Sequence, residues 1–250
     1  MSQAPFKNFS SLLVPLLMDD VDTDQIIPAR FLIATGKEGY GENLFRDLRF
    51  NPQGEAGPEF PLNNPLYETP RAHAHGISLK GDQAESAVAV LPPSRKASAD
   101  PQSRIHPRAD ARGFPAEADK NARILLAHRD FGSGSSREHA VWALSEYGFK
   151  AVIAITFGDI FKNNCYKNGL LPVSLPEVAV DQMHKDAAGS PQEEAHLDLE
   201  RQTVSWKGKD YRFEIDPFVK ACLRDGVDEI GYILKFEPEI AAFEQRQSQE

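Results

Sequence analysis

Apolar residues along the chain form short runs separated by stretches with helical spacing, and this pattern predicts an α/β protein. Residues 123–128 and 151–157 are rich in apolar residues, as is typical of strands covered on both faces of a sheet. Between them lies a set that shares one face of a predicted helix: Ala140, Val141, Leu144 and Tyr147. Gly148 is predicted to end this helix. The unit is therefore a strand, a helix and a parallel strand with a right-handed crossover.

The same alternation continues toward the carboxyl end. Asp159 is predicted to cap a short helix that Gly169 closes, and residues 170–173 then return to a strand. In open α/β sheets, ligands bind beyond the carboxyl ends of the strands, beside the helices that follow. A ligand is therefore expected near residues 132–137, where the first strand of the unit passes into its helix.

The turn at this position has the composition of an anion site. Residues 130–137 read Asp-Phe-Gly-Ser-Gly-Ser-Ser-Arg, and the glycines let the backbone approach a bound group closely. Ser135, with Glu138 three residues later, is predicted to form a capping box at the start of the helix. The helix N-terminus and Arg137 both favour a carboxylate or phosphate, so an organic anion is the expected ligand.

Two roles are open to Ser135 and Ser136. An alkoxide that faces N–H groups and a guanidinium is stabilised by hydrogen bonds and opposite charge, so a serine here can take a proton from a substrate. Serines at this position are also common as simple helix caps. The pattern alone does not choose between these roles.

Several familiar motifs are excluded by single residues. A nucleophile elbow requires serine where Gly134 stands, and the dinucleotide fingerprint requires glycine where Arg137 stands. A calcium loop that starts in the aspartate-rich segment 19–28 fails because Gln25 and Phe31 replace its glycine and its last glutamate. That segment is instead predicted to be a polar turn in which Asp24 points into a cleft.

Taken together, residues 22–28 and 131–140 resemble the small subunits of 3-isopropylmalate dehydratase, within the aconitase superfamily. The matching motifs are Asp-Thr-Asp-Gln-Ile-Ile-Pro in the first segment and Phe-Gly-Ser-Gly-Ser-Ser-Arg-Glu-His-Ala in the second. The likeness runs from about residue 12 to 63 and from 124 to about 242. It implies a swivelling β/β/α domain of the aconitase type. It also implies isomerisation of 2-isopropylmalate and 3-isopropylmalate, by dehydration and rehydration, in leucine biosynthesis.

The resemblance assigns roles to residues of both motifs. Ser135 matches the base that, as an alkoxide, removes a proton from the carbon next to the hydroxyl-bearing one, and Ser136 helps to hold the substrate. Arg137 matches a residue that binds a substrate carboxylate. Asp24 matches an acidic residue of the same cavity and is expected to take part in catalysis, with Thr23 beside it on the substrate.

The resemblance also implies that this chain holds only part of the active site. Dehydratases of this type use a [4Fe–4S] cluster as a Lewis acid on the departing hydroxyl, and such a cluster needs several cysteine thiolates. The chain has only Cys165 and Cys222, without ligand spacing. We therefore expect no cofactor or metal on this chain. A separate large subunit is expected to carry the cluster, in a heterodimer or heterotetramer, and the chain alone is expected to be inactive.

The substrate within this class is not determined by the sequence. Phe31, Leu32 and Ile33 could contact an isopropyl group, but apolar residues after a turn are more often core. Arg30 is expected to contact the substrate dicarboxylate, although it could equally be a surface charge. The alternatives are a related hydro-lyase of the methylmalate/citraconate or homoaconitate type, or a non-catalytic anion-binding assembly module.

Length and composition set the remaining expectations. With 250 residues and 41% hydrophobic content, residues 1–250 are expected to form one domain, with a flexible, loop-rich insertion at about 64–123. The formal net charge of −9 argues against nucleic-acid binding. No signal peptide and no membrane segment are expected, because the amino-terminal apolar run is short and leads into aspartates. The cytoplasm is the expected location.

Overall fold

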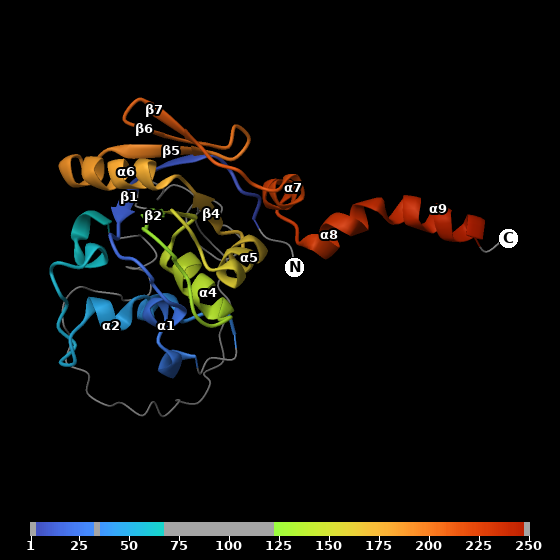
Figure 1. Cartoon of the computed structure of the whole chain (residues 1–250). Coiled ribbons are helices and arrows are strands. Elements are labelled where there is room, and N and C mark those ends of the chain that lie inside the picture. Colours follow the sequence, from blue (N-terminus) through green and yellow to red (C-terminus); the bar gives the residue numbers. More distant parts are fainter. Residues whose placement is uncertain (1–3, 33–35, 68–122, 248–250) are drawn as a thin grey trace, which may run out of the picture.

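A mixed sheet of seven strands lies at the centre of the protein, in the order β4-β3-β2-β1-β5-β6-β7 (Figure 1). The computed structural model describes residues 4–32, 36–67 and 123–247, so most of the expected insertion, residues 68–122, lies outside the described residues. Four strands run parallel to one another: β1 (Phe9–Pro15), β2 (Ile124–Leu126), β3 (Ala151–Ala154) and β4 (Leu171–Ser174). Three antiparallel strands extend the sheet beyond β1: β5 (Glu194–Asp198), β6 (Thr203–Trp206) and β7 (Lys209–Arg212).

Helices connect the strands and cover the sheet. Three of them follow β2, β3 and β4 in turn: α4 (Glu138–Tyr147), α5 (Asp159–Lys167) and α6 (Glu177–Gly189). Short elements fill the connection after β1: α1 (Thr23–Ile26), η1 (Ala29–Phe31), η2 (Gly41–Asn43), α2 (Arg46–Arg49), η3 (Pro61–Asn63) and η4 (Pro65–Tyr67). The chain ends in α7 (Pro217–Asp225), α8 (Glu229–Ile233), η5 (Leu234–Phe236) and α9 (Glu237–Gln247).

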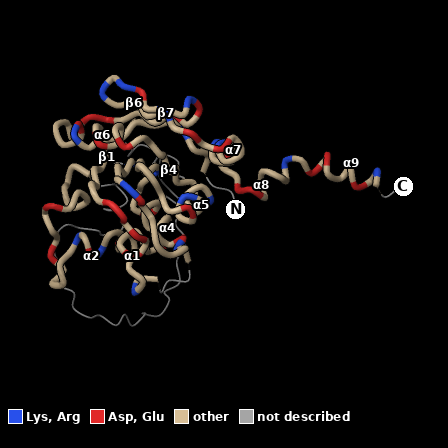
Figure 2. The backbone as a smooth tube through the Cα atoms, in the orientation of Figure 1, with Lys and Arg blue, Asp and Glu red and all other residues tan. Residues whose placement is uncertain are grey.

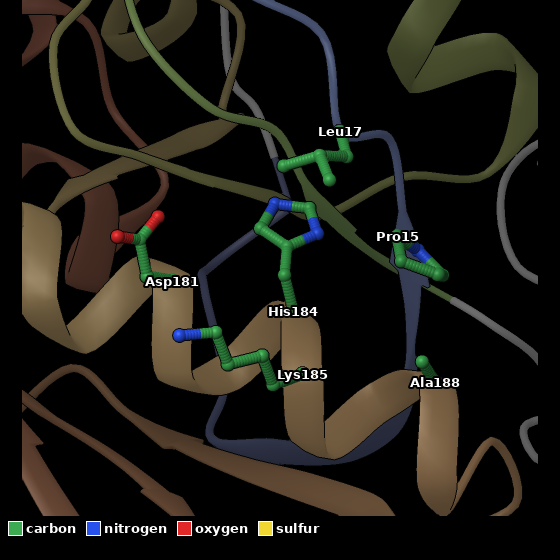
Figure 3. A pocket seen from close by; sticks show the side chains of 6 residues that line it. All are labelled: Pro15, Leu17, Asp181, His184, Lys185 and Ala188. Atoms are coloured by element: carbon green, nitrogen blue, oxygen red, sulfur yellow. The ribbon is translucent and has the colours of Figure 1, made fainter.

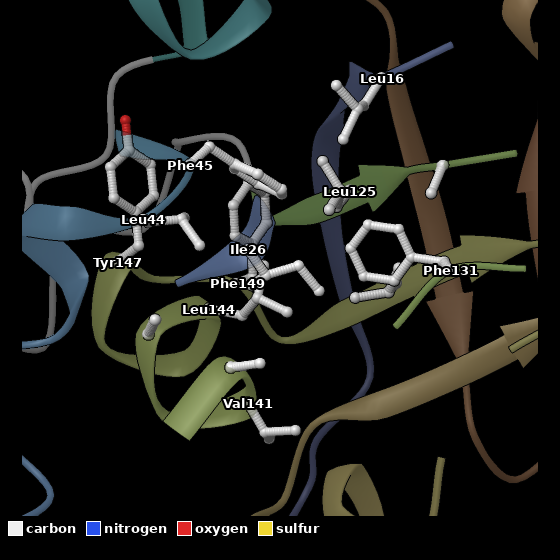
Figure 4. Packing of buried hydrophobic residues seen from close by; sticks show 14 of the residues in the cluster. Leu16, Ile26, Leu44, Phe45, Leu125, Phe131, Val141, Leu144, Tyr147 and Phe149 are labelled. Atoms are coloured by element: carbon white, nitrogen blue, oxygen red, sulfur yellow. The ribbon is translucent and has the colours of Figure 1, made fainter. Parts of the chain in front are cut away.

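Successive residues of the parallel strands enter two separate hydrophobic clusters, one on each face of the sheet. Leu125 and Val152 join the cluster that contains the apolar face of α4 (Figure 4). Leu126 and Ile153 join the cluster formed with α6 and the antiparallel strands. Side chains of a strand alternate between faces, so strands that are buried on both sides need apolar residues at every position. This arrangement explains the unbroken apolar runs in the sequence.

The predicted strand–helix–strand unit is confirmed, and so is its continuation into β4. Helix α4 buries Ala140, Val141, Leu144 and Tyr147 and ends at Gly148, whose φ of +122° is accessible to glycine without strain. The predicted cap of the next helix is wrong by one position. Gly158 occupies the N-cap of α5, and Asp159 is its first residue, where a carboxylate still faces the positive end of the helix dipole.

No helix among the described residues is both long enough and apolar enough to cross a bilayer.

Candidate active site

The carboxyl ends of β1 and β2 bring together the two segments that the sequence singled out. These strands are parallel neighbours, so the residues that follow them leave the same edge of the sheet. The Gly132 N–H donates to the Val21 carbonyl oxygen at 2.7 Å, and the Thr23 N–H donates to the Ser133 carbonyl oxygen at 3.0 Å. Backbone hydrogen bonds therefore fix the aspartate-rich segment against the glycine turn.

A hydroxyl pair forms the centre of this contact. The Oγ1 of Thr23 lies 3.1 Å from the Oγ of Ser135 and 3.3 Å from the Ser135 carbonyl oxygen. Thr23 is 1% exposed, whereas Ser135 is exposed to solvent. A buried threonine hydroxyl that points at the serine oxygen can donate a hydrogen bond to it, and such a bond stabilises the deprotonated form of the serine.

An ion pair flanks the hydroxyls. The guanidinium of Arg137 donates to the carboxylate of Asp24, with side chains that are 24% and 53% exposed. The carboxylate partner of Arg137 is thus a residue of the same chain, Asp24. A ligand carboxylate that reaches this guanidinium must share it with Asp24 or displace it, because both groups use the same N–H donors.

The predicted capping box at the start of α4 is wrong. Helix α4 begins at Glu138, and its N-cap is Arg137, which makes no side-chain capping bond. Glu138 accepts a hydrogen bond from the Nδ2 of Asn168 at 2.7 Å instead of reaching back to Ser135. Ser135 therefore lies before the helix and is free of the capping role, and its hydroxyl faces Thr23.

The polar turn predicted for the aspartate-rich segment is a short helix, α1. Asp22 is its N-cap and accepts from the Gln25 N–H at 2.8 Å, while the Gln25 side chain accepts from the Asp22 N–H at 2.9 Å. This is a reciprocal capping box, and the spacing of an aspartate and a glutamine three residues apart was its signal in the sequence. Asp24 lies in the first turn of α1, and its exposed side chain points to Arg137.

The other residues that the sequence assigned to the substrate have no described side-chain contact with the pair of Ser135 and Thr23. Ser136 is exposed, next to Ser135 in the turn. Arg30 pairs with Asp47 of α2, so its guanidinium is directed to a neighbouring carboxylate, which agrees with the surface-charge alternative. Phe31 and Leu32 are partly buried against the core cluster of Figure 4, and Ile33 lies outside the described residues.

A histidine clamp behind the glycine turn, formed by Asp19, His128 and Asp181, was missed by the sequence analysis. The Nδ1 of His128 lies 2.5 Å from the Asp19 carboxylate, and its Nε2 lies 2.9 Å from the Asp181 carboxylate. The hydrogen bond to Asp181, followed in size by that to Asp19, raises the pKa of His128. The clamp joins the segment before α1, the segment before the glycine turn, and helix α6, so it supports both halves of the site.

We expect the clamp to make stability pH-dependent in the neutral range. A histidine whose pKa is higher in the folded protein stabilises it fully below the unfolded pKa, and this stabilisation is lost as pH rises through the folded pKa. The free energy of unfolding of the wild type, minus that of His128→Gln, should therefore be largest below the usual histidine pKa of about 6.5 and should fall as pH rises above it, in urea titrations.

The subtraction is needed because another histidine acts in the opposite direction. Burial is the first cause that lowers the pKa of His184, so its contribution is lost as pH falls in both proteins, whereas the smaller lowering by the charge of His128 is present only in the wild type. A difference that stays constant with pH would contradict the charged clamp. Asp181→Asn should reduce the pH dependence as well, because it removes the first of the two carboxylates.

Gly132 is expected to be the most sensitive glycine of the turn. Its φ is +76°, and an added Cβ would lie 2.2 Å from the Cγ of Phe161. Gly132→Ala should cost about 2–5 kcal/mol of unfolding free energy, from backbone strain plus displacement of the ring. Gly208→Ala is the matched control, with φ of +71° and no described atom within 4 Å of the added Cβ. It should cost about 1–2 kcal/mol, and equal losses would contradict the contact with Phe161.

Comparisons with known proteins identify the family. The aconitase C-terminal domain model matches residues 106–178. The 3-isopropylmalate dehydratase small subunit of Lactococcus lactis subsp. cremoris is 38% identical over 241 residues, which is 96% of this chain and 97% of that protein. The protein of the same name from Paramagnetospirillum magneticum is 36% identical over 241 residues, covering 96% and 94%. The chain belongs to the 3-isopropylmalate dehydratase small-subunit family.

The fold agrees with this family. The crystal structure of 3-isopropylmalate dehydratase from Methanocaldococcus jannaschii matches with a TM-score of 0.52 at 21% identity, covering 94% of this chain and 99% of that chain. The predicted α/β fold with an aconitase-type swivelling domain is thereby confirmed.

The cysteines of this small-subunit family member do not fit an iron–sulfur cluster. Cys165 is fully buried on α5, and burial raises the pKa of its thiol well above the usual value. Cys222 lies on α7, and burial is the first cause of its raised pKa. Within residues 4–32, 36–67 and 123–247, no three His, Cys, Asp or Glu side chains are grouped to hold a metal.

A pocket beside the histidine clamp does not include the predicted site. It lies between the end of β1 and helix α6 and is lined by Pro15, Leu17, Asp181, His184, Lys185 and Ala188 (Figure 3). The lining is largely apolar apart from the side chains of α6. Ser135 and Asp24 lie instead on an exposed surface, outside this pocket.

Proposed function

We propose that the chain is the small subunit of a 3-isopropylmalate dehydratase, which isomerises 2-isopropylmalate and 3-isopropylmalate by dehydration and rehydration in leucine biosynthesis. The observation that carries this conclusion is the near full-length similarity to relatives that all bear this name, at 36–38% identity over 96% of the chain. The geometry supports it, because the hydroxyl of Ser135 beside Thr23 and the guanidinium of Arg137 beside Asp24 are the groups that a base and a carboxylate-binding residue require.

In this proposal, Ser135 is the base of the reaction. Its deprotonated Oγ takes the proton from the carbon next to the hydroxyl-bearing carbon, the C–H electron pair forms the double bond, and the hydroxyl departs from the neighbouring carbon. The Thr23 hydroxyl, 3.1 Å from Ser135 Oγ, donates a hydrogen bond that holds the charged form in place. For rehydration, hydroxide adds to the carbon that lost the proton, and Ser135 gives its proton to the carbon that lost the hydroxyl. The hydroxyl and the hydrogen thereby exchange positions, and Ser135 is again deprotonated.

Arg137 is the carboxylate-binding group in this account. The substrate carboxylate takes over N–H donors of Arg137 that Asp24 occupies in the structure, which orients the acidic C–H bond toward Ser135. Asp24 then remains beside the substrate, and Ser136 contributes a further hydroxyl from the exposed turn. Arg30 would reach the substrate only by leaving Asp47.

The other half of the active site is assigned to a large subunit that carries a [4Fe–4S] cluster. The cysteines of this chain do not fit such a cluster, and the site residues of this chain are exposed. A heterodimer or heterotetramer in the cytoplasm is the assembly that we propose.

The test is reconstitution under anaerobic conditions. The purified chain is mixed with the cluster-loaded large subunit of the same organism, and the absorbance of the unsaturated intermediate is followed after adding 3-isopropylmalate. We expect a signal only when both subunits are present. The proposal would be contradicted if the large subunit alone were as active as the mixture. It would also be contradicted if the mixture gave no signal although the large subunit retained its cluster spectrum. Methylmalate and homologous tricarboxylates added in parallel distinguish the related hydro-lyases.

A further inference from the structure

The last elements of the chain form an arm that projects from the body of the protein. Helices α8 and α9, with η5 between them, extend beyond α7 in Figure 1. Tyr232 packs its ring edge-on against Phe218 of α7 at 4.9 Å, and Lys235 donates to the Asp225 carboxylate at 2.5 Å. These contacts fix the root of the arm. Every described residue from Ile233 to Gln247 is exposed, so the outer part leaves the body.

This arm exposes apolar side chains that ordinary folding would bury. Among the described residues, ten large apolar side chains are exposed, and six of them lie in the arm. Their exposed fractions range from 42% to 69%: Ile230, Ile233, Leu234, Phe236, Ile240 and Phe243. Aromatic and aliphatic side chains of this size are typical anchors of interfaces and are costly to leave in water. The arm therefore has the composition of a docking segment.

The spacing of the apolar residues gives the arm one contact face. Ile233, Phe236, Ile240 and Phe243 follow one another at intervals of three, four and three residues, the spacing of a helical seam. The backbone is also helical where α8 passes through η5 into α9, since Ile233, Leu234 and Glu237 have αR backbone angles. A helix with one apolar stripe fits an apolar groove.

The length and charge of the arm argue against a second copy of this chain as the occupant. The stripe covers about two heptads, whereas coiled coils normally need three or four. Glu237, Glu239 and Glu244 flank the stripe in its heptad positions. Figure 2 shows acidic positions along the arm. A parallel pair of arms would place Glu239 beside Glu244 of the other copy, and an antiparallel pair would bring Glu237 and Glu244 together. In the antiparallel pair, Glu239 and Arg246 would be the one flanking pair of opposite charge. Repulsion between glutamates therefore disfavours pairing of two arms.

We propose that the arm, residues 229–247, docks as a helix into an apolar groove with a basic rim on the large subunit. This inference rests on the proposed function, which supplies that partner. The acidic flanks of the stripe complement lysines and arginines at the edges of such a groove. The groove supplies a preformed surface, which a short helix needs for stable binding.

The experiment compares two variants in the full chain. Ile240→Ser combined with Phe243→Ser removes two exposed anchors of the stripe. Ala242→Ser combined with Gln245→Ser is the matched control, since it changes the outward side of the same helix. Affinity for the purified large subunit is measured by calorimetry, subunit mass in solution by light scattering, and folding by thermal unfolding. Reconstituted activity is recorded at saturating subunit concentration.

The stripe variant should bind the large subunit at least about 10-fold more weakly than wild type, while the control binds within about 2-fold. Both variants should unfold at the wild-type temperature, and full activity should return at high concentration of the stripe variant. Equal affinity of all three proteins, with an active complex, would overturn the docking role and leave the proposed function intact. If the wild-type chain alone were a dimer and the stripe variant a monomer, the stripe would bind a second copy of this chain, which would also overturn the docking role. A wild-type chain that binds no large subunit would reject both proposals.

Discussion

Ser135→Ala is expected to lower kcat of the complex with the large subunit by about 10²- to 10⁴-fold, the usual contribution of a positioned base. The exposed hydroxyl of Ser135 has one described side-chain partner, the buried Thr23 hydroxyl, so its removal leaves the fold nearly unchanged. The loss should appear in kcat, with KM for 3-isopropylmalate changing little, because the base acts on the C–H bond in the transition state.

Two comparisons separate this role from a structural one. Ser10→Ala removes a serine that pairs with His196 between β1 and β5, and it should retain wild-type kcat. Thr23→Val removes the hydroxyl that supports the alkoxide and should lower kcat by about 10-fold or more, with a basic shift of the lower limb of the pH profile. Wild-type turnover by Ser135→Ala, in a complex of normal affinity, would exclude the proposed base.

Arg137→Lys is expected to lower kcat/KM by about 10²-fold, mainly through a higher KM. Lysine keeps the positive charge but loses the planar pair of N–H donors that matches a carboxylate. The variant should also weaken the contact to Asp24, whose carboxylate accepts from the same guanidinium. Kinetics at varied substrate concentration, with subunits at saturation, measure the effect.

Arg129→Lys is the matched control for this substitution. Arg129 lies just before the same turn, and its guanidinium is likewise paired with an exposed carboxylate, that of Glu177. We expect kcat/KM to change by less than about 3-fold, because exposed ion pairs contribute little. If Arg129→Lys and Arg137→Lys had equal effects, a specific carboxylate contact by Arg137 would be refuted.

The sequence predicted best the parts of the fold that depend on local pattern. Helix α4 and strands β2 and β3 follow from apolar spacing and unbroken apolar runs, since burial on one or two faces dictates those residues directly. The start of α4 was misplaced because Ser135 has the residue type of a cap but is engaged by Thr23, which is 112 residues away. A tertiary contact of this kind leaves no local signal.

The same limit applies to the histidine clamp and to the arm. Asp19 and Asp181 lie 109 and 53 residues from His128, and only the sheet order brings them together. The stripe from Ile233 to Phe243 has helical spacing, but spacing alone does not tell a buried face from an exposed one. By contrast, the short motifs around Asp24 and Ser135 indicated a shared site, and the parallel pairing of β1 and β2 places them together.

In our proposal, the contact between α1 and the glycine turn is this chain's half of a shared active site. The most direct test is a structure of the complex with the large subunit and bound isopropylmalate. We predict that Arg137 contacts a substrate carboxylate and that Ser135 Oγ lies within about 3.5 Å of the carbon that loses its proton. The claim would be contradicted if Arg137 stayed on Asp24 and Ser135 faced solvent, away from the substrate and the large subunit.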